Sequence, residues 1–174
     1  LKPLAWPRVA DLGTGSGAIA VSIACEWPEA KVTAVDVSAA MNLELEAKRH
    51  RLPCELEILP LDLTGEPLHT CLDGVRFDGI VSSLTLHHVA DILALLARFY
   101  TLLPPGGFIA LADLDAEDGR FHPDMSGVYH AGFAREQIRA LAEQAGFSQV
   151  EICTASVAQK PWGEYPIFLL TARR

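Results

Sequence analysis

The sequence predicts an α/β fold with a mainly parallel β-sheet, and three observations lead to this prediction. Apolar runs of strand length alternate with longer segments of helical pattern, which is typical of βαβ units. A glycine-rich turn, Gly13-Thr14-Gly15-Ser16-Gly17, joins the first apolar run to the first helical segment. A Pro-Pro-Gly-Gly turn at 104–107 stops a later helical segment before another apolar run. With 174 residues, the chain has the size of one domain with a sizeable core, so we expect a single domain over 1–174.

Apolar runs of strand length predict the parallel part of the sheet. These five strands are expected at 8–12, 31–36, 54–59, 77–82 and 107–113. Amphipathic segments between them predict helices at 17–26, 39–51 and 88–102. A short or irregular crossover is expected between Leu61 and Arg76.

The pattern changes after the fifth strand. Residues 114–133 are polar, carry histidines and form a longer connection than α/β units normally use, which makes them a candidate functional loop or lid. A helix is expected at 134–145, followed by strands at 150–154 and 165–172. Only about ten residues without a helical pattern separate these strands, too few for a parallel crossover, so they should pair antiparallel. The sheet should therefore have seven strands and end in a hairpin.

Composition excludes several classes of protein. The net charge is -8 and the single basic run is Lys48-Arg49-His50-Arg51, which argues against a nucleic-acid partner. No apolar run approaches the roughly 20 residues of a membrane span, and no signal-peptide pattern is present, so we expect a soluble, cytoplasmic protein without a membrane partner. The four cysteines are widely spaced, which indicates neither a zinc site nor disulfides but small core residues. These are Cys25, Cys54, Cys71 and Cys153.

The glycine turn predicts a binding site for a nucleotide-like cofactor. Its glycines allow backbone conformations barred to other residues and let a ligand approach closely, and the following helix offers free N–H groups. Gly13, Gly15 and Ala18 also satisfy the dinucleotide pattern G-x-G-x-x-G/A. Asp36, about 20 residues downstream, could accept hydrogen bonds from two ribose hydroxyls, whether the cofactor is a dinucleotide or another nucleotide-like molecule. Alternatively it could cap a helix, a role for which Ser38 is a competing candidate. The turn alone leaves the cofactor open.

Further segments resemble the class I S-adenosylmethionine-dependent methyltransferases, and the resemblance covers nearly the whole chain. In chain order they are Asp11-Leu12-Gly13-Thr14-Gly15-Ser16-Gly17, Val35-Asp36-Val37-Ser38, Leu61-Asp62-Leu63, Phe77-Asp78-Gly79-Ile80-Val81-Ser82-Ser83 and Leu103-Pro104-Pro105-Gly106-Gly107. The resemblance implies a Rossmann-like sheet of strand order 3-2-1-4-5-7-6, with the last strand antiparallel and helices on both faces. It also implies S-adenosyl-L-methionine as cofactor.

The resemblance implies a role for each matching residue. The glycine turn would contact the amino-acid part of the cofactor, Asp36 its ribose and Asp62 the adenine amino group. Val37 and Met41 would be apolar neighbours of the adenine, although Met41 is equally well explained as an interior helix residue. Asp11 would mainly brace the turn. The residues expected at the cofactor are Asp11, Gly13, Thr14, Gly15, Gly17, Asp36, Val37, Met41, Asp62, Leu63, Ser82 and Ser83.

The acceptor is less defined than the cofactor. Leu86-His87-His88-Val89 and parts of 112–133 and 165–170 resemble small bacterial ubiquinone and menaquinone methyltransferases. The stretch 14–20 looks more like the protein-glutamine and RNA N6-adenine methyltransferases, which hold a planar amide or amine with an Asn-Pro-Pro-aromatic motif. Ser82-Ser83-Leu84-Thr85 stands at those positions, so we expect a small-molecule acceptor. The oligomeric state cannot be predicted.

Methyl transfer mainly requires alignment of acceptor, methyl group and sulfur, and a general base only where the acceptor must lose a proton. The weak candidates for this base are His87, His88 and His122, with Asp113, Asp115, Tyr129 and His130 as further possibilities. His87 and His88 are better explained as a helix cap or a pocket wall. Asp113, Asp115, Asp118 and His122 could form an oxygen-rich metal site, but charged loops are usually only solvated, so no metal is expected.

Two alternatives stay open at this point. One is a nicotinamide-dependent oxidoreductase domain, and the other is a non-catalytic S-adenosylmethionine-binding protein of the same fold. Only seven residues precede the first strand, which leaves no room for the N-terminal helices that usually cover the cofactor in the family. We therefore expect a fragment or an unusually open site.

Overall fold

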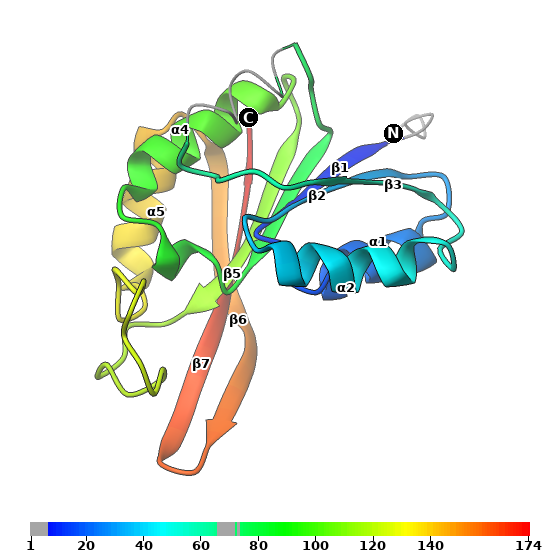
Figure 1. Ribbon diagram of the computed structural model, residues 1–174. Coiled ribbons are helices and arrows are strands. Elements are labelled where there is room, and N and C mark those ends of the chain that lie inside the picture. Colours follow the sequence, from blue (N-terminus) through cyan, green and yellow to red (C-terminus); the bar gives the residue numbers. More distant parts are fainter. Residues whose placement is uncertain (1–6, 66–71, 73) are drawn as a thin grey trace.

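A seven-stranded sheet lies between two groups of helices in the computed structural model, which describes residues 7–65, 72 and 74–174. Figure 1 shows α1 (Ala18–Glu26) and α2 (Ala39–Arg49) on one face of the sheet. On the other face lie α4 (Ile92–Leu102) and α5 (Arg135–Gln144). The sheet is thus covered on both sides, as expected for a doubly wound fold.

The strand order is β3-β2-β1-β4-β5-β7-β6. The seven strands are β1 (Arg8–Leu12), β2 (Lys31–Val35), β3 (Glu55–Leu59), β4 (Gly79–Ser83), β5 (Phe108–Leu114), β6 (Ser148–Lys160) and β7 (Gly163–Arg173). The first five are parallel, and β7 is antiparallel to both β5 and β6. The predicted fold class and strand order are confirmed. The order reverses between β1 and β4, which is where ligands bind in open α/β sheets.

The helices bury one face each against the sheet. In α4 the buried positions Ile92, Leu95, Leu96, Phe99 and Leu102 recur at helical spacing, so that one stripe faces the core. On the opposite face the core is smaller, with Ala20 of α1 and Leu45 of α2 over β2 and β3. These two cores hold the carboxyl ends of the central strands in fixed positions.

Gly17 brings α2 close to the start of α1. Its φ of +83° lies in the left-handed region, and a Cβ added there would lie 2.3 Å from a methyl carbon of Leu45. Since only glycine tolerates both conditions, the turn after β1 is set by backbone geometry and by its neighbour in α2.

The segment after β4 differs from the prediction. Instead of a helix from residue 88, Leu86–His88 form a short 3-10 turn, η1, and α4 begins only after Asp91. The Asp91 carboxylate accepts a hydrogen bond of 2.9 Å from the Ala94 N–H and so caps α4. The chain makes a separate turn at the sheet edge before the helix starts.

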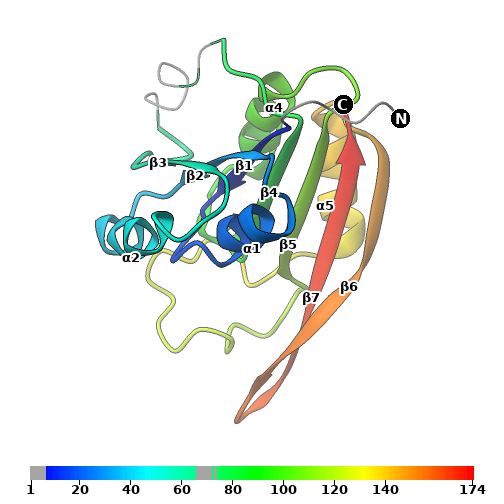
Figure 2. The same cartoon turned by 90° about the vertical axis from the view of Figure 1, so that its right-hand side faces the viewer.

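The final hairpin is longer than predicted. β6 and β7 extend until only Pro161 and Trp162 separate them, and the pair projects beyond the rest of the sheet (Figure 2). Most β6 side chains are exposed on both faces, so the sequence lacks the alternation of apolar and polar residues that reveals a half-buried strand. The predicted ten-residue connection is therefore wrong, although the antiparallel pairing is confirmed.

The expectation that the cysteines are core residues is wrong for two of them. Cys25 at the end of α1 and Cys153 on the outermost strand β6 are exposed, and Cys54 is exposed only in part. Cys25 and Cys153 lie on the solvent side of elements that are covered on one side only. Cys71 lies outside the described residues. Within the described part of the chain, no helix has the length and apolar character needed to cross a membrane.

Candidate functional site

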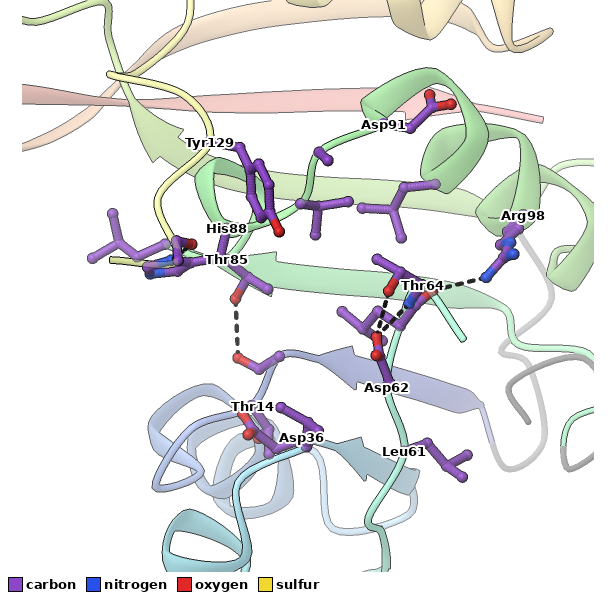
Figure 3. A pocket seen from close by; sticks show the side chains of 18 of the residues that line it. Thr14, Asp36, Leu61, Asp62, Thr64, Thr85, His88, Asp91, Arg98 and Tyr129 are labelled. Carbon is purple, nitrogen blue, oxygen red and sulfur yellow. Dashed lines mark hydrogen bonds between the residues drawn. The ribbon is translucent and has the colours of Figure 1, made fainter. Parts of the chain in front are cut away.

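A cavity of about 940 Å³ opens at the carboxyl ends of β1, β2 and β4 (Figure 3). Its floor is the glycine turn after β1, and its sides follow β2, β3 and β4. The fourth side is formed by η1 and the start of α4. This position at the reversal of strand order, and a volume at the upper end of the usual range for ligand sites, make it the candidate site.

The glycine turn packs directly against the turn after β4. Gly13 has φ +72°, and a Cβ there would lie 2.3 Å from the Thr85 side chain. The Thr85 hydroxyl donates to the carbonyls of Gly13 (3.2 Å) and Ser83 (3.1 Å), and Figure 3 shows the first of these bonds as a dashed line. The absence of a side chain at Gly13 therefore lets two strand ends meet beneath the cavity.

Asp11 braces the turn from below. Its buried carboxylate accepts hydrogen bonds from the Thr14 hydroxyl (2.6 Å) and from the N–H of Ala20 in α1 (3.0 Å). Burial raises the pKa of Asp11 to about 6, since the two hydrogen bonds offset only part of the desolvation of the charge. Asp11 is not among the cavity-lining residues, in agreement with its expected bracing role.

Asp36 lies at the end of β2 and lines the cavity. One carboxylate oxygen accepts from the N–H of Gly15 (2.7 Å) and the other from the N–H of Ser38 (2.8 Å). Ser38 itself occupies the N-cap position of α2 and accepts from the Met41 N–H. The capping role is thus taken by Ser38, and Asp36 presents its carboxylate between the glycine turn and the cavity.

Asp62 follows β3 and faces the same cavity (Figure 3). One of its oxygens accepts from both the N–H and the hydroxyl of Thr64, each at 2.7 Å. These hydrogen bonds hold the pKa of Asp62 below its usual value. Arg98 of α4 donates to the carbonyl of Leu63 at 3.1 Å. The segment after β3 is thereby tied to α4 across the site.

The structure brings together most residues that the sequence assigned to the cofactor. Those lining the cavity are Gly13, Thr14, Gly15, Asp36, Val37, Asp62, Leu63 and Ser83. Asp11, Gly17, Met41 and Ser82 do not line it. Ser82 is buried, and its hydroxyl donates to the Leu12 carbonyl at 2.5 Å. Contact of any of these residues with a cofactor stays a prediction.

The sequence identified one wall of the cavity only in part. This wall comes from η1, α4 and the long loop, and His88 and Tyr129, which were candidate bases, line it. The lining residues that were not expected are Thr85, Val89, Ala90, Asp91, Ala94, Leu95, Arg98 and Gly127, together with Leu61 and Thr64 after β3. Whatever follows a parallel strand starts at the carboxyl edge of the sheet, and this signal places the whole segment after β4, and not its histidines alone, at the site.

Three histidines meet beside this wall. His87 and His88 belong to η1 and His122 to the loop between β5 and α5, and one ring nitrogen of each lies within 4.8 Å of the others. His87 is buried, with Nδ1 2.6 Å from Asp113 Oδ1 and Nε2 3.0 Å from His122 Nε2. His88 is exposed and lines the cavity. Burial, followed by the neighbouring His87 and His88, lowers the pKa of His122. All three weak candidates for a base thus fall at one place.

The oxygen-rich cluster that the loop composition suggested is not assembled. Asp115 pairs with Arg135 at 2.6 Å, and Asp118 pairs with Arg120. Asp113 is buried against His87. The three carboxylates thus face three different partners, and only Asp113 shares its partner, His87, with His122. His130, another candidate base, has its Nε2 3.0 Å from the Val89 carbonyl.

The chain resembles methyltransferases in sequence. A family described as "Methyltransferase domain" matches residues 10–109. A release factor glutamine methyltransferase of Bordetella pertussis is 36% identical over 160 residues, covering 86% of this chain and 57% of that relative. A release factor glutamine methyltransferase of Xylella fastidiosa strain Temecula1 is 76% identical over 140 residues, covering 79% of this chain and 41% of that relative. The chain thus spans little more than half of the first of these relatives and less of the second. The expected likeness to quinone methyltransferases is not what these matches show.

Solved structures agree on the architecture. A CurJ carbon methyltransferase superimposes with a TM-score of 0.80 at 19% identity, covering 99% of this chain and 50% of that structure. At this identity the likeness concerns the fold alone. The fold is therefore shared with a solved methyltransferase.

Proposed function

The chain belongs to the methyltransferase domain family, in which S-adenosylmethionine is the methyl donor, and we propose from this that its cavity binds the donor and delivers the methyl group to an acceptor beside η1. The observation that carries the proposal is the grouping of Gly13–Gly15, Asp36 and Asp62 around one cavity of about 940 Å³. A bare backbone turn and two carboxylates match the charged amino-acid end, the ribose and the adenine of such a donor.

The glycine turn, Asp36 and Asp62 line the cavity in the same order as the amino-acid end, the ribose and the adenine follow one another in the donor. The turn at Gly13–Gly15 offers backbone groups at the start of α1, where an α-helix favours a carboxylate. Asp36 can accept hydrogen bonds from two ribose hydroxyls, and its existing bond to the Gly15 N–H fixes its direction. Asp62 is held as an acceptor by Thr64, which suits an exocyclic amine. Each group thus binds a different part of the donor.

The methyl group would leave on the side of Thr85, His88 and Tyr129, away from Asp36 and Asp62 (Figure 3). Transfer is an in-line displacement, so the protein has to align acceptor and sulfur and exclude water. The His87–Asp113 pair lies next to this side, with a ring nitrogen 2.6 Å from the carboxylate. An acceptor that must lose a proton could pass it to His88, which lines the cavity beside this pair.

The acceptor we propose is a small molecule that loses a proton, such as a hydroxyl compound or an acidic carbon acid. Among the residues that line the cavity there is no asparagine or glutamine side chain. The turn after β4 offers Ser83, Leu84 and Thr85, and the Thr85 hydroxyl is engaged with two carbonyls. Nothing in this turn therefore resembles a clamp for a planar amide.

A second candidate acceptor is a glutamine side chain of a peptide release factor. Its support is the 36% and 76% identity to release factor glutamine methyltransferases. Because the chain spans only part of those relatives, their acceptor comes to this chain as a proposal. Methylation of a glutamine in the absence of the amide clamp would require other groups to orient the amide.

Two experiments test the function in sequence. Calorimetry of the chain with S-adenosylmethionine should give one site, which NAD does not compete for, and Asp36→Asn should weaken it about 10- to 100-fold, as for loss of hydrogen bonds to a charged group. Asp124→Asn, an exposed aspartate of the long loop, is the control. Stabilisation by NAD alone would overturn the proposal.

Transfer of a labelled methyl group then separates the acceptors. A panel of hydroxyl, thiol and acidic carbon compounds is compared with an intact peptide release factor. Label in the small molecules supports the first acceptor, and label in the protein supports the second. Tight donor binding without transfer to either would indicate the non-catalytic alternative.

A further inference from the structure

We propose that His87, His88 and His122 form a binding site for a divalent transition metal ion of the Zn²⁺ type, with its open side toward the cavity. The site goes beyond methyl transfer and does not depend on which acceptor is used. It also differs from the oxygen-rich set considered from the loop composition, of which only His122 is a ligand here and Asp113 only orients His87.

The proximity of the three rings is the first observation. One nitrogen of each lies within 4.8 Å of the others, and the Nε2 atoms of His87 and His122 are 3.0 Å apart. Two nitrogen ligands of a tetrahedral zinc ion lie about 3.3 Å apart, since each Zn–N bond is about 2.0–2.1 Å. The nitrogens of His87 and His122 are thus close to the spacing of two ligands of one ion, and the His88 nitrogen lies within 4.8 Å of both.

The hydrogen bonds of His87 fix which nitrogen is free. Asp113 accepts from the N–H of Leu114 (2.7 Å) and from the N–H of His87 (3.3 Å). A carboxylate that already accepts from two amides also accepts from the ring, so Nδ1 of His87 carries the hydrogen at 2.6 Å from Oδ1. In the neutral ring the lone pair then lies on Nε2, which points at His122.

His88 is oriented in the same manner. Its Nδ1 lies 2.8 Å from the carbonyl oxygen of Gly127. A carbonyl only accepts, so Nδ1 donates and Nε2 of the neutral ring keeps its lone pair. Zinc-bound histidines characteristically donate their second nitrogen to a carboxylate or a backbone carbonyl. Two of the three rings here have such a partner.

The type of ion follows from the ligands. Three neutral imidazoles suit Zn²⁺ and similar transition ions, whereas Mg²⁺ and Ca²⁺ require oxygen ligands. Three protein ligands leave the fourth position of a tetrahedral ion open. Because His88 lines the cavity, that position faces the space assigned to the acceptor. The ion would also fasten the loop that carries His122 to η1.

The test uses the untagged chain after treatment with a chelator. Titration with ZnCl₂, followed by gel filtration and elemental analysis, should leave one zinc per chain. Co²⁺ in the same site should give the visible absorption of a four-coordinate ion. Replacing His122 by Asn should weaken zinc binding by at least about 100-fold, and Asp113→Asn by about 10- to 100-fold, the effect typical of an outer carboxylate.

Two controls separate a built site from scattered binding to histidine. His130→Asn changes a histidine in the same loop, and His50→Asn changes an exposed histidine at the end of α2. Both should keep one zinc per chain. Less than stoichiometric zinc in the folded native chain, or unchanged zinc in His122→Asn, would overturn the proposal. Circular dichroism of each variant shows that the chain is folded.

Discussion

The two sides of the cavity are built by different means. The side formed by the turns after β1, β2 and β3 relies on backbone geometry and on carboxylates that are fixed by neighbours within a few residues or on adjacent strands. The opposite side relies on side chains brought together from η1 and a loop more than thirty residues away. The first arrangement suits the methyl donor, which is the same in every reaction, and the second suits an acceptor, which can differ from one enzyme to another.

Among substitutions on the first side, those in the glycine turn should weaken donor binding the most. Gly13→Val would introduce a Cβ 2.3 Å from Thr85 at φ +72°, so we expect donor binding to be lost, with at least a 100-fold higher Kd by calorimetry. Gly106→Ala is the matched control, because Gly106 has φ +84° but open space around it. If both variants lost donor binding equally, the effect would come from backbone strain and not from the contact with Thr85.

The histidine side should act on turnover and leave donor affinity nearly unchanged. For an acceptor found in the transfer assay that must lose a proton, and with the chain kept free of zinc, His88→Gln should lower kcat about 10²- to 10⁴-fold, as for loss of a general base that lines the cavity. The Kd of S-adenosylmethionine should change less than about threefold, because His88 lies on the η1 side of the cavity and not beside Asp36 or Asp62. A parallel rise in Kd would contradict the division between the two sides.

The contribution of Asp11, which braces the first side, can be measured from the pH dependence of the free energy of unfolding. Its pKa is about 6 in the folded chain against 3.8 unfolded, so the folded state holds more protons between these values. Stability should therefore fall as pH rises from about 4 to above 6, by about 3 kcal/mol at 1.36 kcal/mol per unit. Urea denaturation of the native chain and of Asp11→Asn isolates this difference. A difference that does not change with pH would contradict the raised pKa.

Asp62 should give the smallest effect. It is exposed and its bonds to Thr64 are local, so Asp62→Asn should weaken donor binding about tenfold, or about 1.4 kcal/mol. The change should be larger than that of Asp124→Asn in the same calorimetric experiment. An effect as large as that of Gly13→Val would mean that the carboxylates, and not the backbone, dominate the first side.

The first side could be predicted from the sequence because its determinants are local. Asp36 follows the buried strand β2, Asp62 follows the short strand β3, and the glycines mark the turn between Leu12 and Ala18. The histidine side could not, since the meeting of His122 with His87 depends on the path of residues 114–133. No periodicity encodes such a path. The length of β6 was likewise hidden, because a strand exposed on both faces has no apolar alternation.

The outer edge of β6 has a consequence for association. An exposed strand at the end of a sheet offers unpaired amide groups with which another chain can pair. In β6 the pairing with β7 shifts register at two places, between Ser148 and Glu151 and between Thr154 and Ser156. Such irregularities bend and twist a strand, so a second molecule finds no long straight edge to extend. The longest regular stretch of this edge thereby runs only from Ser156 to Lys160.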